Sequence, residues 1–257
     1  MSVITSETIQ TTFDMADGLV QMAVNEVSSG LNQIAFDNLS VEDAQAAAHE
    51  VIYDTMVKYS EVGQVAGTEL YDSLRDIAQA RGYYNAVTMS DLSDAIAASA
   101  RYAAYGDEDA VTNEEYDAYK QRAAETTARA ALAGMRDSMI YNAVNENKVY
   151  GNTSSSKSGV RYARVVHPGA TKHGPCAFCV MLASRGFVYA TEESAGEFDR
   201  WHDDCACTVI PSWGEGGNYD GYEEYRDMYD NATSSLKSGQ YTEKNVLSLL
   251  RSTYGLH

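Results

Sequence analysis

The first 167 residues of this 257-residue chain contain no proline, and no other feature constrains the fold as strongly. Proline removes a backbone N–H and breaks helix interiors, so a long stretch without it leaves room for helices of unusual length. All three prolines lie further along, at Pro168, Pro175 and Pro211. The sequence therefore predicts a helical first part, followed by a region built differently.

Apolar residues recur at intervals of three and four through this first part, the spacing of one face of an α-helix. Ser40, which acidic residues follow closely, is typical of a helix N-cap. The run Thr112-Asn-Glu-Glu115 has the pattern of a capping box. The helices expected from these patterns cover residues 9–27, 40–59, 68–81, 90–105 and 112–147.

The second part begins with a glycine- and serine-rich run over 151–159, which has little to bury and predicts a flexible linker. The β-branched residues of 160–166 then predict a strand. Short helices are expected near 222–231 and 242–254. The predicted division is 1–150, a helical assembly domain; 151–159, the linker; 160–213, a cysteine- and histidine-rich module; and 214–257, an acidic, tyrosine-rich loop with C-terminal helices.

The net charge of the chain argues against some classes of binding partner. The chain has 37 acidic residues against 19 lysines and arginines, a formal charge of −18. Such a surface repels phosphate backbones, which argues against direct nucleic-acid binding over a broad area. No apolar run reaches the roughly 18 residues of a membrane span, and the start lacks the pattern of a signal peptide. We therefore expect no membrane partner and a reducing cytoplasm, where cysteines stay thiols or bind metal.

Four cysteines and a histidine form the one constellation that carries chemistry. Cys176-x-x-Cys179 is followed, after 22 residues, by His202, Cys205 and Cys207. A Cys-x-x-Cys turn directs two thiolates at one ion, and thiolate with imidazole is the donor set of structural zinc sites. One zinc ion per chain is predicted, with Cys176, Cys179 and Cys205 in the set. His202 and Cys207 compete for the fourth position.

Other interpretations of the cysteines are weaker. Two disulfides require an oxidising compartment, and a thioredoxin-like redox pair leaves the second cluster unexplained. Zinc deaminases place His-x-Glu ahead of Pro-Cys-x-x-Cys. Here the nearby histidines, His167 and His173, lack the glutamate that would act as the base. No nucleotide-binding, hydrolase or metalloprotease motif occurs, so we predict no catalytic residue, no organic cofactor and no enzyme.

The cysteine-rich segment resembles the Cys-rich module of MuF-like minor capsid proteins, the head-morphogenesis proteins of tailed phages. The resemblance covers about residues 160–213. The residues that carry it are Cys176-Ala-Phe-Cys179 with the following residues to Gly186, Tyr189, Trp201, His202, Cys205, Cys207 and Pro211. Asp203 stands where many members of the family have proline.

The resemblance implies a virion structural protein, present in few copies in the portal region or capsid interior and in the host cytoplasm during assembly. Its implied partners are the portal protein and the major capsid or scaffold protein, with self-association as a further expectation. The competing interpretation is a zinc-dependent hydrolase or nuclease of phage origin. The expected fold is mainly α, with a long-helix N-terminal region, a small zinc-stapled α+β module and a short helical tail.

Overall fold

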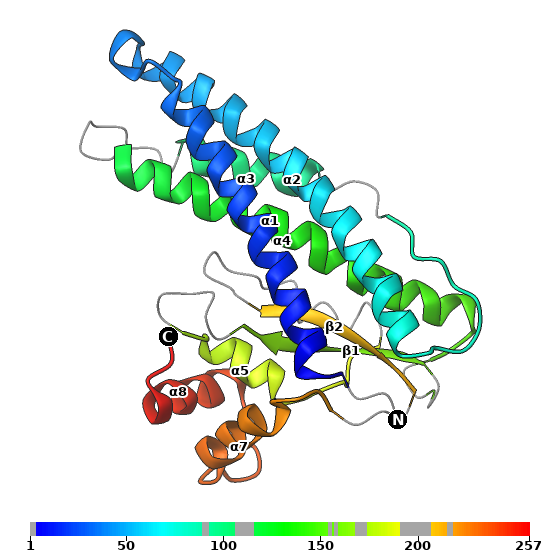
Figure 1. Ribbon diagram of the computed structural model, residues 1–257. Coiled ribbons are helices and arrows are strands. Elements are labelled where there is room, and N and C mark those ends of the chain that lie inside the picture. The colour runs from blue at the N-terminus through cyan, green and yellow to red at the C-terminus, as the bar shows by residue number, and fades with distance from the viewer. Residues whose placement is uncertain are drawn as a thin grey trace. The chain divides into compact units, whose positions relative to one another are not determined.

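The computed structural model describes residues 4–88, 93–105, 116–153, 156, 159–167, 174–190, 207–214 and 218–257. In this part of the chain the protein is mainly helical, with a two-stranded antiparallel sheet (Figure 1). The long helices are α1 (Ser6–Asn32), α2 (Val41–Ile77) and α4 (Tyr116–Val149); the shorter ones are α3 (Ser93–Tyr105), α5 (Ala177–Ala183), α7 (Tyr222–Thr233) and α8 (Glu243–Tyr254). The strands are β1 (Val160–Val166) and β2 (Cys207–Trp213). The mainly α class with a small sheet is confirmed.

Local signals located most of these elements. The strand over 160–166 and the helices near 222–231 and 242–254 are confirmed as β1, α7 and α8. Ser40 is confirmed as a cap, since the Asp43 N–H donates to its Oγ at 3.1 Å. The predicted starting signals at Ser90 and at 112–115 lie outside the described residues.

One helix prediction was wrong. The separate helices expected over 40–59 and 68–81 form a single helix of 37 residues, α2. The residues between them include Gly63 and Gly67, which weaken a helix, but no proline, which would end it. Both glycines are buried at a close contact with α4, so packing holds the helix together where local propensity is poor.

The chain forms two compact units, each assembled from several segments. The sheet unit comprises Met1–Asp14, Glu69–Val87 and Met139–His257, and the helical unit comprises Met15–Thr68 and Thr88–Ser138. Helices α1, α2 and α4 therefore contribute residues to both. The predicted domain division at the 151–159 linker stays a prediction.

The core of the helical unit is rich in alanine. Its buried residues are Val27, Leu31, Ala48, Ile52, Met56, Ile96, Ala100, Ala103, Ala104, Tyr119, Ala123 and Ala130. Small side chains let helices approach closely, and α2 and α4 reach backbone contact. A Cβ atom on Gly63 would collide with the carbonyl oxygen of Ala131, and one on Gly134 with that of Ser60.

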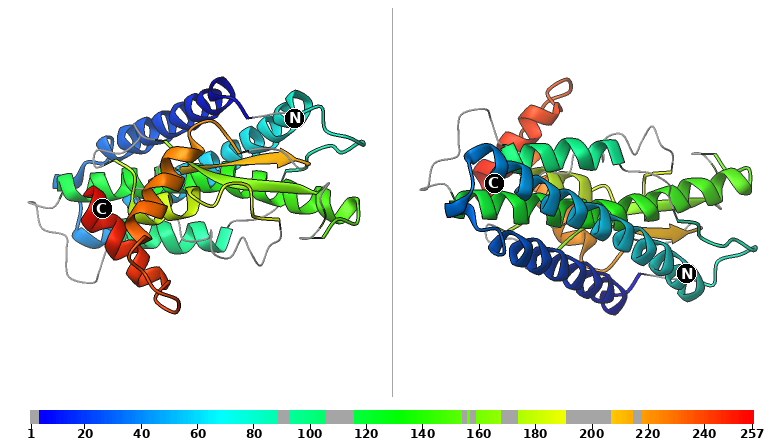
Figure 2. Two further views of the ribbon diagram at one scale, coloured as in Figure 1. Left: turned by 90° about the horizontal axis from the view of Figure 1, so that it is seen from below. Right: turned by 90° about the horizontal axis from the view of Figure 1, so that it is seen from above.

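The sheet unit surrounds the two strands. Val160 of β1 pairs with Trp213 of β2, and Val166 pairs with Cys207. Helix α5 packs on β1 and also contacts α7 and α8, the last two side by side at the orange and red end of the chain (Figure 1, Figure 2). The start of α1 belongs to this unit too, since the Ser6 N–H donates to Asp220 Oδ2 at 2.9 Å. Among the described residues, no helix is long and apolar enough to cross a membrane.

Candidate metal centre

Two of the five predicted metal ligands lie at the start of α5. Cys176 is the N-cap of this helix, with an extended backbone at φ −76° and ψ 152°. Its Sγ accepts a hydrogen bond from the Cys179 N–H at 3.2 Å, a role that serine or asparagine takes at many helix starts. The local fold therefore places both thiols on a single turn, as the Cys-x-x-Cys spacing predicts.

The separation of these two sulfur atoms bears on zinc binding. The Sγ atoms of Cys176 and Cys179 lie 2.9 Å apart. A tetrahedral zinc ion with Zn–S bonds of about 2.3 Å holds neighbouring sulfurs about 3.8 Å apart. A change of about 1 Å in their separation, within reach of side-chain rotation, would give the spacing of a zinc pair. The two residues fit as half of a zinc site.

A third predicted ligand, Cys207, reaches the same core from β2. It is the first residue of that strand, it pairs with Val166 and its exposed fraction is 1%. Cys207 belongs to one apolar cluster with Cys176 and Cys179. The antiparallel pairing of β2 with β1 thus brings a cysteine from 28 positions later in the sequence into the core that α5 covers.

Tyr225 of α7 lies in the same apolar cluster as the thiols of α5 and the thiol of Cys207. Burial, together with the negative charge of Glu224, raises the pKa of the Tyr225 phenol to about 12. The thiols of Cys207 and Cys179 also raise this pKa. The phenol and the two thiols share one buried environment, although they come from α7, α5 and β2.

The remaining predicted ligands, His202 and Cys205, lie outside the described residues, as does His173. In the part of the chain that the structure describes, no three His, Cys, Asp or Glu residues form a group that could hold a metal ion. Cys207 therefore shares the core with the α5 pair without completing a three-ligand set. The full zinc site stays a prediction.

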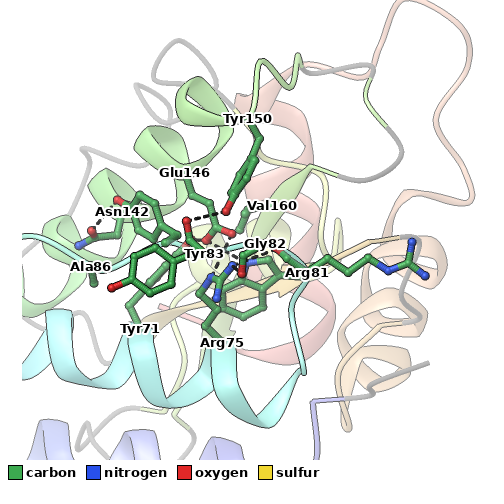
Figure 3. Close-up of polar contacts among 12 residues, drawn as sticks. Tyr71, Arg75, Arg81, Gly82, Tyr83, Ala86, Asn142, Glu146, Tyr150 and Val160 are labelled. Atoms are coloured by element: carbon green, nitrogen blue, oxygen red, sulfur yellow. Dashed lines mark hydrogen bonds and ion pairs between the residues drawn. The ribbon is translucent and has the colours of Figure 1, made fainter.

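Sequence reasoning missed a buried polar cluster around Glu146 of α4 (Figure 3). The Glu146 carboxylate accepts hydrogen bonds from Tyr71 Oη at 2.8 Å, Arg75 Nε at 3.1 Å and Trp213 Nε1 at 3.0 Å. Its exposed fraction is 2%. Arg75 also donates to the backbone carbonyls of Arg81 and Gly82. The carboxylate thereby joins α2, α4 and β2 inside the sheet unit.

The cluster continues along α4 through two asparagines. The Asn142 side chain exchanges hydrogen bonds with the backbone of Val87, and it also accepts from Tyr84 Oη at 2.9 Å. Asn147 does the same with the backbone of Val160, the first residue of β1, at 2.8 Å in both directions. Each buried amide thus satisfies backbone groups that would otherwise be costly to bury.

The hydrogen bonds of this cluster hold α2, α4 and β2 together. Both carboxylate oxygens of Glu146 already accept hydrogen bonds from rigid donors, and burial with the nearby negative charge of Glu146 strongly raises the pKa of Tyr71. A general base needs an oxygen that can reach a substrate proton. The signal in the sequence was the spacing of Asn142 and Glu146, polar residues four positions apart on one face of a helix.

Comparison with protein-family models shows which family the chain belongs to. The model of the VG15 protein family matches residues 4–232. The chain belongs to the VG15 family. It is a phage-associated family of virion genes. No curated protein and no solved structure matches the chain.

The VG15 match includes Cys176, Cys179 and Cys207 as well as Glu146, and it takes in residues of both compact units. It supports the predicted relation to phage particles at the level of a virion-associated family. A MuF-like minor capsid protein is a finer assignment than this match. The match ends at residue 232, before α8.

Proposed function

We propose that this VG15 protein is a structural component of the phage particle, a minor capsid or head-morphogenesis protein in the portal region or capsid interior. One zinc ion, held by Cys176, Cys179 and Cys205 with either His202 or Cys207, would stabilise its sheet unit. The partners would be the portal protein and the major capsid or scaffold protein. The family match over residues 4–232 carries the proposal.

The buried thiols support a structural role for the metal. Cys176, Cys179 and Cys207 have exposed fractions of 5% or less and lie among apolar side chains. A zinc ion held by three or four thiolates is electron-rich and leaves no position for an activated water, so it acts as a crosslink. Such a crosslink suits the two-stranded sheet of the described residues, because two strands by themselves are marginally stable.

Metal analysis tests the zinc. Reduced, purified protein is expected to carry about one zinc ion per chain, because the spacing supplies one tetrahedral set. Cys176→Ser and Cys205→Ser should each lose the ion. Hydrogen exchange of Cys176→Ser should show that the helical unit stays folded. Metal-free wild-type protein with four readily alkylated thiols would contradict the zinc proposal.

Interaction with the portal protein tests the role. Val62 and Val65 of α2 lie one turn apart in the helical unit, with exposed fractions of 39% and 48%. Large apolar side chains on a helix surface are typical contact residues between chains. Val62→Glu with Val65→Glu is expected to weaken co-purification with the portal protein of the same phage about tenfold, the loss of a central apolar contact.

A matched control comes from the sheet unit, where Val188 has an exposed fraction of 50%. Val188→Glu should leave co-purification and zinc content unchanged. Detection of the protein in purified particles, by mass spectrometry, should accompany these results. Absence from mature particles and from procapsids, or metal-dependent hydrolysis of nucleic acid or peptide by the purified protein, would contradict the structural role.

A further inference from the structure

The last helix lies outside the family match but contacts the cysteine-bearing helix. Residues 233–257 follow the VG15 match, and α8 within them packs against both α5 and α7. Val246 and Leu250 of α8 are buried in the apolar cluster that contains Cys176 and Cys179. The surroundings of the two thiols are thus completed by a segment that the family match leaves out.

The chain after α8 turns toward α5. Gly255 caps α8 in the left-handed conformation, at φ 67°, and its N–H donates to the Arg251 carbonyl at 2.9 Å. Leu256 is partly buried against the apolar cluster. The backbone oxygen of His257 then accepts a hydrogen bond from the Ala177 N–H at 2.9 Å. Ala177 is the residue directly after Cys176.

This hydrogen bond fixes the turn that carries the thiols. The first N–H groups of a helix have no partner within the helix. In α5 the Cys179 N–H is taken by the Cys176 sulfur, and the Ala177 N–H by His257. Two donors of this turn are therefore satisfied outside the helix ladder, one by a cysteine and one by residue 257. Opening of the turn requires the second contact to break.

We propose that residues 255–257 form a clamp on the first turn of α5, which limits access to Cys176 and Cys179 and slows the release of a metal ion from them. The metal part of this inference rests on the proposed function. The access part does not, because it concerns the thiols whether or not they hold zinc. Cys207 lies in the same apolar cluster but on β2 and not on the clamped turn, so it serves as an internal reference.

Alkylation of the metal-stripped full chain tests access. Iodoacetamide labelling in excess chelator, mapped by mass spectrometry, gives separate rates for Cys176, Cys179 and Cys207. A variant that ends at Tyr254 loses the hydrogen bond and the Leu256 contact, so labelling of Cys176 and Cys179 should accelerate about tenfold relative to Cys207. Zinc-loaded protein should lose its ion to a chelator faster by a similar factor.

Two substitutions separate the backbone from the side chain. No atom would lie within 4 Å of a Cβ on Gly255, so Gly255→Ala disturbs only the left-handed turn and should accelerate labelling in the same direction, but less. His257→Ala keeps the backbone oxygen that accepts from the Ala177 N–H, so it should accelerate labelling less than the shortened variant does. Equal acceleration at all three cysteines would show global loosening and overturn the clamp, as would unchanged rates in the shortened variant or a full effect of His257→Ala. Failure of the zinc proposal is a different result, a wild-type protein that binds no metal.

Discussion

In the helical unit the backbones of α2 and α4 touch, whereas in the sheet unit the same two helices are joined through buried polar side chains. The first contact depends on Gly63, Gly67 and Gly134, where an added Cβ would strike a carbonyl oxygen of the other helix. The second depends on Glu146, which accepts hydrogen bonds from Tyr71 and Arg75 of α2. One pair of helices thus uses two kinds of interface.

The two interfaces should tolerate different kinds of substitution. Close backbone packing has no space for an extra methyl group, but it contains no charge that can be left unpaired. A buried carboxylate with three donors tolerates small shifts, but loss of the carboxylate isolates a buried guanidinium. The sheet unit should therefore be sensitive to changes of charge, and the helical unit to changes of volume.

Removal of the carboxylate should give the largest effect. Glu146→Ala leaves Arg75 buried without its carboxylate, and the free energy of unfolding should fall by about 3–5 kcal/mol. Glu125→Ala, at an exposed position of the same helix, should change it by no more than about 0.5 kcal/mol. Urea denaturation gives both values. In hydrogen exchange of Glu146→Ala, residues 139–149 and 207–213 should lose protection first. Equal loss over 48–56, in the helical unit, would contradict the difference in charge sensitivity between the two units.

An added methyl group in the helical unit should come next. Gly134→Ala places a Cβ against the Ser60 carbonyl, and overpacking should cost about 1–3 kcal/mol of the free energy of unfolding. Gly18→Ala, in α1, has no atom within 4 Å of the new Cβ and should instead stabilise the protein by about 0.5–1 kcal/mol. Thermal unfolding of the pair distinguishes packing from propensity. A stabilising Gly134→Ala would refute the close contact.

Alkaline pH should lower the free energy of unfolding of the sheet unit, in part because Tyr71 ionises more readily in the unfolded state. Burial and the charge of Glu146 raise the pKa of its phenol above that of the unfolded chain, near 10. Above about pH 10 the unfolded state releases a proton that the folded state retains, so stability falls with rising pH, by about 1.4 kcal/mol per pH unit for this residue. Below pH 10 this contribution is constant.

The comparison of wild type with Tyr71→Phe isolates that contribution. The variant should be less stable at pH 7, because Glu146 loses one donor, but its stability should decline less steeply between pH 10 and about 11. Urea midpoints at each pH provide the slopes. Parallel slopes for the two proteins would show that Tyr71 ionises as readily in the folded state as in the unfolded one.

The two helix caps should give the smallest effects. Ser40 caps α2 through the Asp43 N–H at 3.1 Å, and Thr242 caps α8 through the Asn245 N–H at 3.3 Å. Ser40→Ala and Thr242→Ala should each lower the free energy of unfolding by about 1 kcal/mol. Hydrogen exchange near each cap should show that the loss is local. Only Thr242→Ala should also accelerate labelling of Cys176, because α8 leads into the clamp.

Local signals were enough to find much of the fold. The periodic stripe of α1, the β-branched run of β1 and the Ser40 cap of α2 each depend on residues within a few positions of one another. The Cys-x-x-Cys spacing likewise predicted that Cys176 and Cys179 share one turn, and they do. The break expected before residue 68 failed because helix propensity was judged without the partner helix that buries Gly63 and Gly67.

By itself, the sequence determined α1 and α4, one strand, the helical tail and the pair of thiols at the start of α5, because hydrogen bonds within a turn or a strand depend on neighbouring residues. Only the tertiary structure decided that Glu146 meets Tyr71 and Arg75, more than 70 positions away, and that residue 257 closes the turn beside Cys176. Such contacts leave no local pattern, since each partner alone has the sequence of an ordinary helix or loop. They form because buried donors and acceptors must find partners wherever the packed chain brings them.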